Sequence, residues 1–124
     1  MLYCAQSIAL ACLETVVHLK ASGLPFNRYL VKIDIPDAAW VAATSISATS
    51  APIGWDAVPA SKTSIDFGNK WAAGNASLLL AVPSVIVPEE YCILINPLHP
   101  DIKSLGATKV RKFTYDPRIG GGAP

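Results

Sequence analysis

The amino-acid sequence predicts one α+β domain. Its 124 residues are the usual length of a single domain, and an apolar fraction of 52% suffices for a buried core. Segments with a helical pattern alternate along the chain with short strand-like segments. Short strands interleaved with helices favour mixed β-sheets with helices packed beside them.

The N-terminal half is expected to hold one long helix and one strand. Residues 5–20 predict a helix because Ala, Leu, Cys, Gln and Glu dominate there, and Gly23 and Pro25 follow it. Most of this helix is apolar, so we expect it to be buried on most sides. Residues 29–35 alternate in polarity and predict a strand that ends at Pro36, with Val31, Ile33 and Ile35 on its apolar face.

The second half predicts a helix followed by several short strands. Residues 38–59 are mixed and contain turns at 52–54 and 58–59. The later elements, in order, are a helix at 61–73 ending at Gly74, a strand or strand pair at 77–87 broken at Pro83, a strand at 91–95, a turn at 96–97, a short helical piece at 100–105, a strand at 109–115 and a flexible tail at 120–124.

Composition excludes several functional classes. The net charge is +1, so there is no basic excess to bind nucleic acid directly through its phosphates. No run of about twenty apolar residues predicts a membrane span. The three cysteines are odd in number and lack Cys-x-x-Cys spacing, which favours reduced thiols in the cytoplasm over disulfides or a thiolate metal site.

The first candidate site lies on the N-terminal helix. Ser7, Glu14 and His18 fall on its one polar stripe, and Tyr3 precedes it. Glu14 and His18 are four residues apart and therefore face the same way on a helix. This arrangement suits a carboxylate beside an aromatic ring that binds a sugar or stabilises a cation. From spacing alone, an ordinary helix-stabilising Glu–His pair is favoured.

Two further candidates lie at breaks in the C-terminal half. Ser84 follows Val82-Pro83 and either points its hydroxyl into a site or caps the next turn; capping is favoured by the sequence alone. The motif Asn96-Pro97-Leu98-His99-Pro100 is a rigid loop that would present Asn96 and His99 to a ligand. Its alternative is an Asx turn in which Asn96 binds its own backbone, and this alternative is slightly favoured.

Taken in order, these motifs resemble one family, the RES-domain proteins. The resemblance covers Leu2 to about Ile119 and rests on five stretches: Leu2-Tyr3-Cys4-Ala5-Gln6-Ser7 with Leu13-Glu14 and His18; Asp66-Phe67-Gly68-Asn69-Lys70-Trp71; Val82-Pro83-Ser84; Asn96 to Pro100; and Phe113-Thr114-Tyr115-Asp116-Pro117-Arg118. The family is named for an Arg, a Glu and a Ser. Glu14 and Ser84 match the last two, and Tyr3 matches the aromatic residue of the same pocket.

The resemblance implies the toxin of a bacterial toxin–antitoxin pair. It implies a fold similar to the ADP-ribosyltransferases, with mixed sheets around a cleft for NAD⁺, and cleavage of the nicotinamide–ribose bond by hydrolysis or phosphorolysis. NAD⁺ is then the substrate, with no cofactor and no metal. Glu14, Ser84 and Tyr3 would be catalytic, and Tyr3, Ser7, His18, Asn96 and His99 would bind substrate. The implied partner is an antitoxin that covers the active site, and a homodimer is left open.

The resemblance also leaves alternatives. The family's Arg lies upstream of the tyrosine, whereas this chain begins two residues before Tyr3. The expected domain is therefore 1–119 without its N-terminal segment, and 120–124 form the tail. One alternative is transfer of ADP-ribose to a protein. Another is an inactive, truncated remnant that only binds a protein partner.

Overall fold

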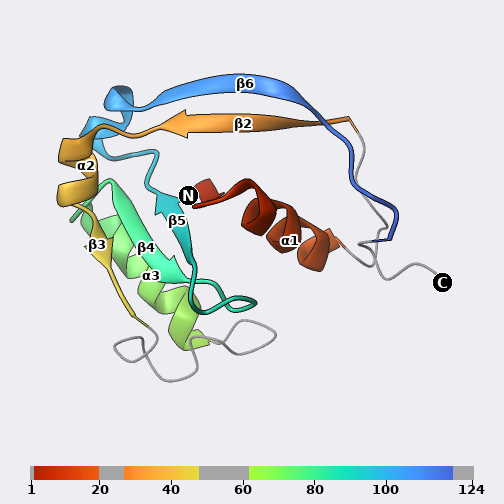
Figure 1. The fold of residues 1–124 in the computed structure, drawn as a ribbon. Helices are drawn as coiled ribbons and strands as arrows, with labels where there is room; N and C mark the ends of the chain where they lie inside the picture. The colour runs from red at the N-terminus through yellow and green to blue at the C-terminus, as the bar shows by residue number, and fades with distance from the viewer. Residues whose placement is uncertain (1, 20–26, 48–61, 119–124) are drawn as a thin grey trace.

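The computed structural model describes residues 2–19, 27–47 and 62–118, and for 18–19 and 62–66 the backbone only. Its elements, in order, are β1 (Leu2–Ala5), α1 (Ile8–Leu19), β2 (Arg28–Asp34), α2 (Asp37–Val41), β3 (Thr44–Ser45), α3 (Lys62–Gly74), β4 (Leu79–Pro83), β5 (Tyr91–Ile95), the 3₁₀ helix η2 (Pro100–Ser104) and β6 (Gly106–Phe113). Figure 1 shows their arrangement in space. The predicted turns at 52–54 and 58–59 and the tail at 120–124 lie outside the described residues.

The strands form two sheets. Four strands pair in the order β1-β5-β4-β3, and β2 pairs with β6 in a two-stranded sheet. All pairs are antiparallel except β3 with β4, which is parallel. Helices and mixed sheets in one short chain confirm the predicted α+β class. β1 pairs only with β5 and is antiparallel to it. The N-terminal strand is therefore an edge strand of the larger sheet (Figure 1).

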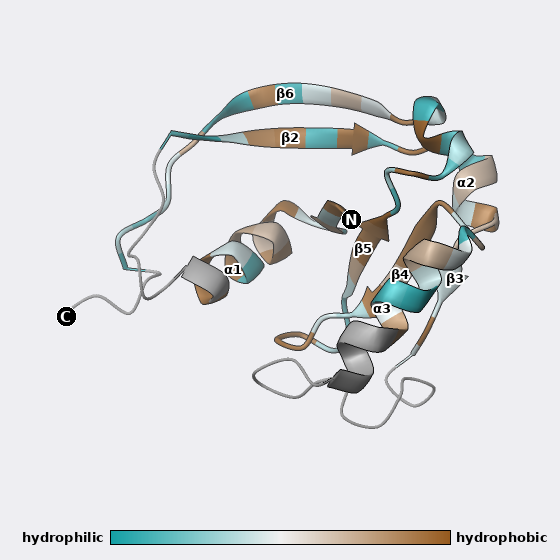
Figure 2. Ribbon diagram, turned by 180° about the vertical axis from the view of Figure 1, so that it is seen from behind, coloured by the Kyte–Doolittle hydropathy of each residue, from teal (hydrophilic) through white to brown (hydrophobic). Residues whose placement is uncertain are grey.

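Both faces of the larger sheet are covered by other elements. Leu79, Ile93 and Ile95 point to one face, where Ile33 of β2 and Ala39 of α2 pack against them. Leu80 and Leu94 point to the other face and pack against Trp71 of α3. Figure 2 shows β4 and β5 as continuously apolar strands. Apolar residues at successive positions are typical of a strand that is covered on both sides.

Several element boundaries differ from the sequence prediction. The helix predicted from residue 5 starts only at Ile8, and residues 2–5, for most of which no element was predicted, form β1 because they pair along β5. Part of the mixed segment forms the short helix α2. The last strand covers 106–113 instead of 109–115, because its first residues pair with Asp34 and Ile33. The other predicted helices and strands within the described ranges are present.

The predicted apolar face of β2 is confirmed except at Val31. Ile33 and Ile35 pack against the core, but Val31 is 50% exposed. The register shifts between Leu30 and Val31, which leaves Val110 as the extra residue on β6. A bulge interrupts the alternation of side chains on the strand that carries the extra residue, here β6. Both figures show the pair extending away from the larger sheet and past α1 (Figures 1 and 2), and most residues of the two strands are exposed.

The described residues bear on the expected thiols and on membrane spans. Cys4, Cys12 and Cys92 are all free thiols. Within the described ranges, no helix has the length and apolarity needed to cross a bilayer.

Candidate functional site

The candidate site is centred on the carboxylate of Glu14. Glu14 lies in the middle of α1 and is half-buried, and the Ser84 hydroxyl donates a 2.7 Å hydrogen bond to its Oε1. Ser84 directly follows Pro83, the last residue of β4. The structure therefore brings the two residues that match the family's name into direct contact.

Ser84 also organises the turn that follows β4. Its Oγ accepts hydrogen bonds from the backbone N–H groups of Ile86 and Val87, both at 3.1 Å. Its own N–H donates to the carbonyl oxygen of Glu90 at 2.8 Å, which closes the connection to β5. Ser84 is only 1% exposed. The turn capping favoured by the sequence is confirmed, and the same hydroxyl also contacts Glu14.

Cys92 is a third member of this group, and sequence reasoning missed it. Its Sγ lies 3.5 Å from Glu14 Oε1 as a hydrogen-bond donor, and the residue is buried. Burial, with the charge and the hydrogen bond of Glu14, raises the pKa of this thiol to about 12. Cys92 is therefore a protonated donor at neutral pH and not a thiolate nucleophile. In the sequence it looks like any small residue of an apolar strand, so no local signal marks it.

Tyr3 approaches the same group from β1. It pairs with Leu94 on β5, and Ala5 pairs with Cys92. Side chains of paired residues share a face and alternate along a strand, so Tyr3 lies on the same face as Cys92. The pKa of the Tyr3 phenol is raised, first by desolvation and then by electrostatic interaction with Cys92 and Glu14. The residue is nevertheless 74% exposed, so its ring is open to a ligand.

Together these groups can stabilise a cation beside an aromatic ring. The half-buried carboxylate of Glu14 is anchored on a helix, and the neutral donors Ser84 and Cys92 both contact it. A carboxylate that is held in place beforehand stabilises positive charge that develops during a reaction. No three His, Cys, Asp or Glu side chains in the described part of the chain gather as a metal site would require.

Two other predicted site residues lie at the two ends of α1. Ser7 caps the start of the helix, because its Oγ accepts from the backbone N–H of Leu10 at 3.1 Å. The same hydroxyl donates to Glu90 Oε1 at 3.5 Å, which links the helix start to the β4–β5 connection. His18 lies in the last turn of α1, and its side chain is outside the described residues.

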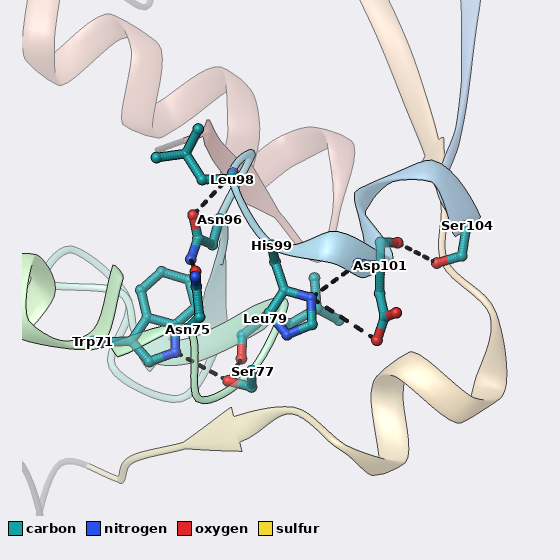
Figure 3. Close-up of polar contacts among 9 residues, drawn as sticks. All are labelled: Trp71, Asn75, Ser77, Leu79, Asn96, Leu98, His99, Asp101 and Ser104. Atoms are coloured by element: carbon teal, nitrogen blue, oxygen red, sulfur yellow. Dashed lines mark hydrogen bonds and ion pairs between the residues drawn. The ribbon is translucent and has the colours of Figure 1, made fainter. Parts of the chain in front are cut away.

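Asn96 and His99 lie at the opposite end of β5. Asn96 follows the strand, about 13 Å beyond Cys92 at the usual rise per residue. It is 1% exposed, and its amide group donates to the carbonyl of Ala72 at 3.0 Å and to Asn75 Oδ1 at 2.8 Å. Its Oδ1 accepts from the N–H of Leu98 at 3.1 Å, which is an Asx turn. Figure 3 shows this group of polar contacts.

His99 has a local role in the same loop. Its Nδ1 accepts from the backbone N–H of Asp101 at 3.1 Å and so caps η2 (Figure 3). A neighbouring buried cluster joins Ser77 to the indole N–H of Trp71 at 3.0 Å and to the carbonyl of Leu79 at 2.8 Å. The structure therefore brings Tyr3, Glu14 and Ser84 together and places Asn96 and His99 elsewhere.

Comparison with known proteins identifies the family. A family model described as the RES domain matches residues 1–116. A protein of Sphingobium sp. named "Prs ADP-ribosylating toxin" is 56% identical over 119 residues, which cover 96% of this chain and 74% of that protein. A protein of Yersinia enterocolitica named "Toxin Res" is 34% identical over 119 residues, covering 95% of this chain and 76% of its own length. A "Toxin Res" of Photorhabdus laumondii is 32% identical over 118 residues, covering 94% and 74% respectively. The chain belongs to the RES domain family.

Proposed function

We propose that this protein is the toxin of a toxin–antitoxin pair and that it cleaves the nicotinamide–ribose bond of NAD⁺. The observation that carries the proposal is the contact of Ser84 and Cys92 with the carboxylate of Glu14, on the sheet face that also carries Tyr3. The toxin names of its relatives support the same class of function. A fold similar to the ADP-ribosyltransferases is part of this proposal.

The proposed chemistry follows from the charge that develops on the ribose. When the bond between the nicotinamide nitrogen and ribose C1′ breaks, the electron pair leaves with neutral nicotinamide and C1′ becomes an oxocarbenium-like cation. The Glu14 carboxylate stabilises this charge and orients the attacking group. The exposed ring of Tyr3 packs on the nicotinamide or the ribose. A new bond then forms at C1′, and the attacking group loses its proton.

The attacking group defines the product. Water yields ADP-ribose, phosphate yields ADP-ribose phosphate, and a side chain yields an ADP-ribosylated protein. The name of the Sphingobium relative favours the protein acceptor as the second candidate reaction. The three free thiols favour the reducing environment of the cytoplasm, where NAD⁺ and an antitoxin would be encountered.

The test is NAD⁺ turnover with product analysis. The protein is expressed from its full reading frame in a bacterium with and without its neighbouring antitoxin, and NAD⁺, nicotinamide and protein-bound ADP-ribose are measured. Nicotinamide release that stops with Glu14→Gln supports the proposal. Intact NAD⁺ beside a folded protein that still binds the antitoxin would instead establish the alternative, a binding module without catalysis.

A further inference from the structure

The Ser84 hydroxyl has no hydrogen-bonding capacity left for a ligand. A hydroxyl offers one proton and two lone pairs. The proton goes to Glu14 Oε1, and the lone pairs accept from the N–H groups of Ile86 and Val87. Substrate contact would require breaking one of these bonds at a residue that is 1% exposed. Ser84 is therefore placed to act on Glu14.

Cys92 delivers a second donor to the same oxygen. Ser84 reaches Oε1 from the end of β4 at 2.7 Å, and Cys92 reaches it from β5 at 3.5 Å. Cys92 pairs with Val82, two residues before Ser84, so the two donors come from neighbouring strands of a rigid sheet. The terminal torsion of a glutamate is broad and weakly preferred on its own. Two fixed donors on one oxygen restrict that torsion and set the plane of the carboxylate.

We propose that Ser84 and Cys92 are positioning residues for Glu14: they orient its carboxylate through Oε1 and do not touch the substrate. This inference rests on the proposed function, because it assigns how the same site works. It adds Cys92, a residue outside the family's Arg–Glu–Ser set, to the machinery. It also assigns Ser84 an indirect role in place of the substrate contact that the resemblance implies.

The experiment measures kcat and KM for NAD⁺ in matched variants. Ser84→Ala and Cys92→Ala each remove one donor, and we expect kcat to fall about 10- to 100-fold for Ser84→Ala and less for the weaker thiol donor. KM should stay within twofold of the wild type. Cys92→Ser replaces the thiol by a stronger donor and should restore kcat. Cys4→Ala is the control, since Cys4 pairs with Ile93 and points to the other face of the sheet.

A double-variant cycle separates positioning from substrate contact. If Ser84 and Cys92 act only through Glu14, adding Ser84→Ala to Glu14→Ala should cause no further loss of turnover. The equilibrium affinity for NAD⁺, measured by calorimetry, should be unchanged by Ser84→Ala alone. This second readout holds even if turnover in Glu14→Ala is too slow to measure. Circular dichroism identifies any variant that fails to fold. If Cys92→Ala fails to fold, Cys92→Ser is compared with the wild type in its place.

The outcomes distinguish this inference from the function on which it rests. Wild-type protein that leaves NAD⁺ intact overturns both. An active wild type in which Ser84→Ala or Cys92→Ala raises KM, weakens NAD⁺ binding or adds to the Glu14→Ala defect overturns only the positioning role. A kcat defect that Cys92→Ser does not repair overturns the role of Cys92.

Discussion

Ser84 Oγ and Glu14 Oε1 lie 2.7 Å apart, although 70 positions separate the two residues in the chain. The contact joins the middle of α1 to the end of β4, so it exists only when the helix is docked on the sheet. It holds together the two residues on which the proposed chemistry depends. Its consequences for activity, stability and pH dependence can be measured separately.

Glu14→Gln should abolish most of the turnover of NAD⁺. The amide keeps the shape of the side chain and an oxygen that can accept from Ser84, but it loses the negative charge that stabilises the ribosyl cation. We expect kcat to fall about 100- to 1,000-fold, as for other preorganised charge-stabilising groups. Steady-state nicotinamide release provides the measurement. Glu89→Gln, at an exposed position in the β4–β5 connection, is the matched control and should keep full turnover; equal losses in both variants would contradict the assignment.

Asn96→Ala should destabilise the fold. The substitution removes the part-buried hydrogen bonds that the Asn96 side chain makes with Ala72, Asn75 and Leu98, and we expect the free energy of unfolding to fall by about 1–3 kcal/mol. Urea unfolding measures this change. Asn69→Ala, at an exposed position of α3, serves as the comparison and should change stability by less than about 0.5 kcal/mol. Unchanged stability together with a raised KM for NAD⁺ would restore Asn96 as a substrate-binding residue.

Ser7→Ala and Ser7→Asn should test whether Ser7 stabilises α1 as its N-cap. Alanine removes the acceptor for the N–H of Leu10, which should lower the free energy of unfolding by about 1 kcal/mol. Asparagine is a good N-cap residue and should recover most of that loss. Thermal unfolding of both variants is the measurement. If Ser7→Asn is as unstable as Ser7→Ala, capping is not what Ser7 contributes.

The buried thiol of Cys92 should make the fold less stable in alkali. Its pKa is raised to about 12 in the folded protein, whereas an unfolded cysteine titrates at about 8.5. Between these values the unfolded chain releases a proton that the folded protein retains, so the free energy of unfolding falls as pH rises. Below the unfolded pKa the stabilisation is fully present.

Urea unfolding from pH 7 to about 10.5 tests this pH dependence against Cys92→Ser, whose hydroxyl does not titrate in that range. The decline should be shallower in the variant. Cys4, whose pKa is raised by burial, contributes to both proteins equally. Tyr3, whose pKa is raised in part by Cys92, contributes less in the variant, which makes its decline shallower still. Identical slopes in the two proteins would show that Cys92 is not buried against Glu14 as described.

The local sequence pattern was sufficient for most of the elements. The apolar segment at 91–95 coincides with β5, and the predicted helices overlap α1 and α3 within three residues at each described end. Proline and glycine mark these boundaries through backbone geometry alone, which is why they can be read without a structure. The α+β class follows from the same local signals.

The remaining features depend on contacts between distant residues. Four residues at 2–5 form a strand because they pair along the edge of β5, and Val31 is exposed although it belongs to the same alternating apolar pattern as Ile33. The family resemblance singled out Tyr3, Glu14 and Ser84, but not how they meet. By itself, the sequence determined where helices and strands form and which residues to examine. Only the tertiary structure decided that Cys92 donates to Glu14 and that Asn96 stabilises the loop after β5. Hydrogen bonds between strands and helices depend on distance in space, which periodicity along a chain does not encode.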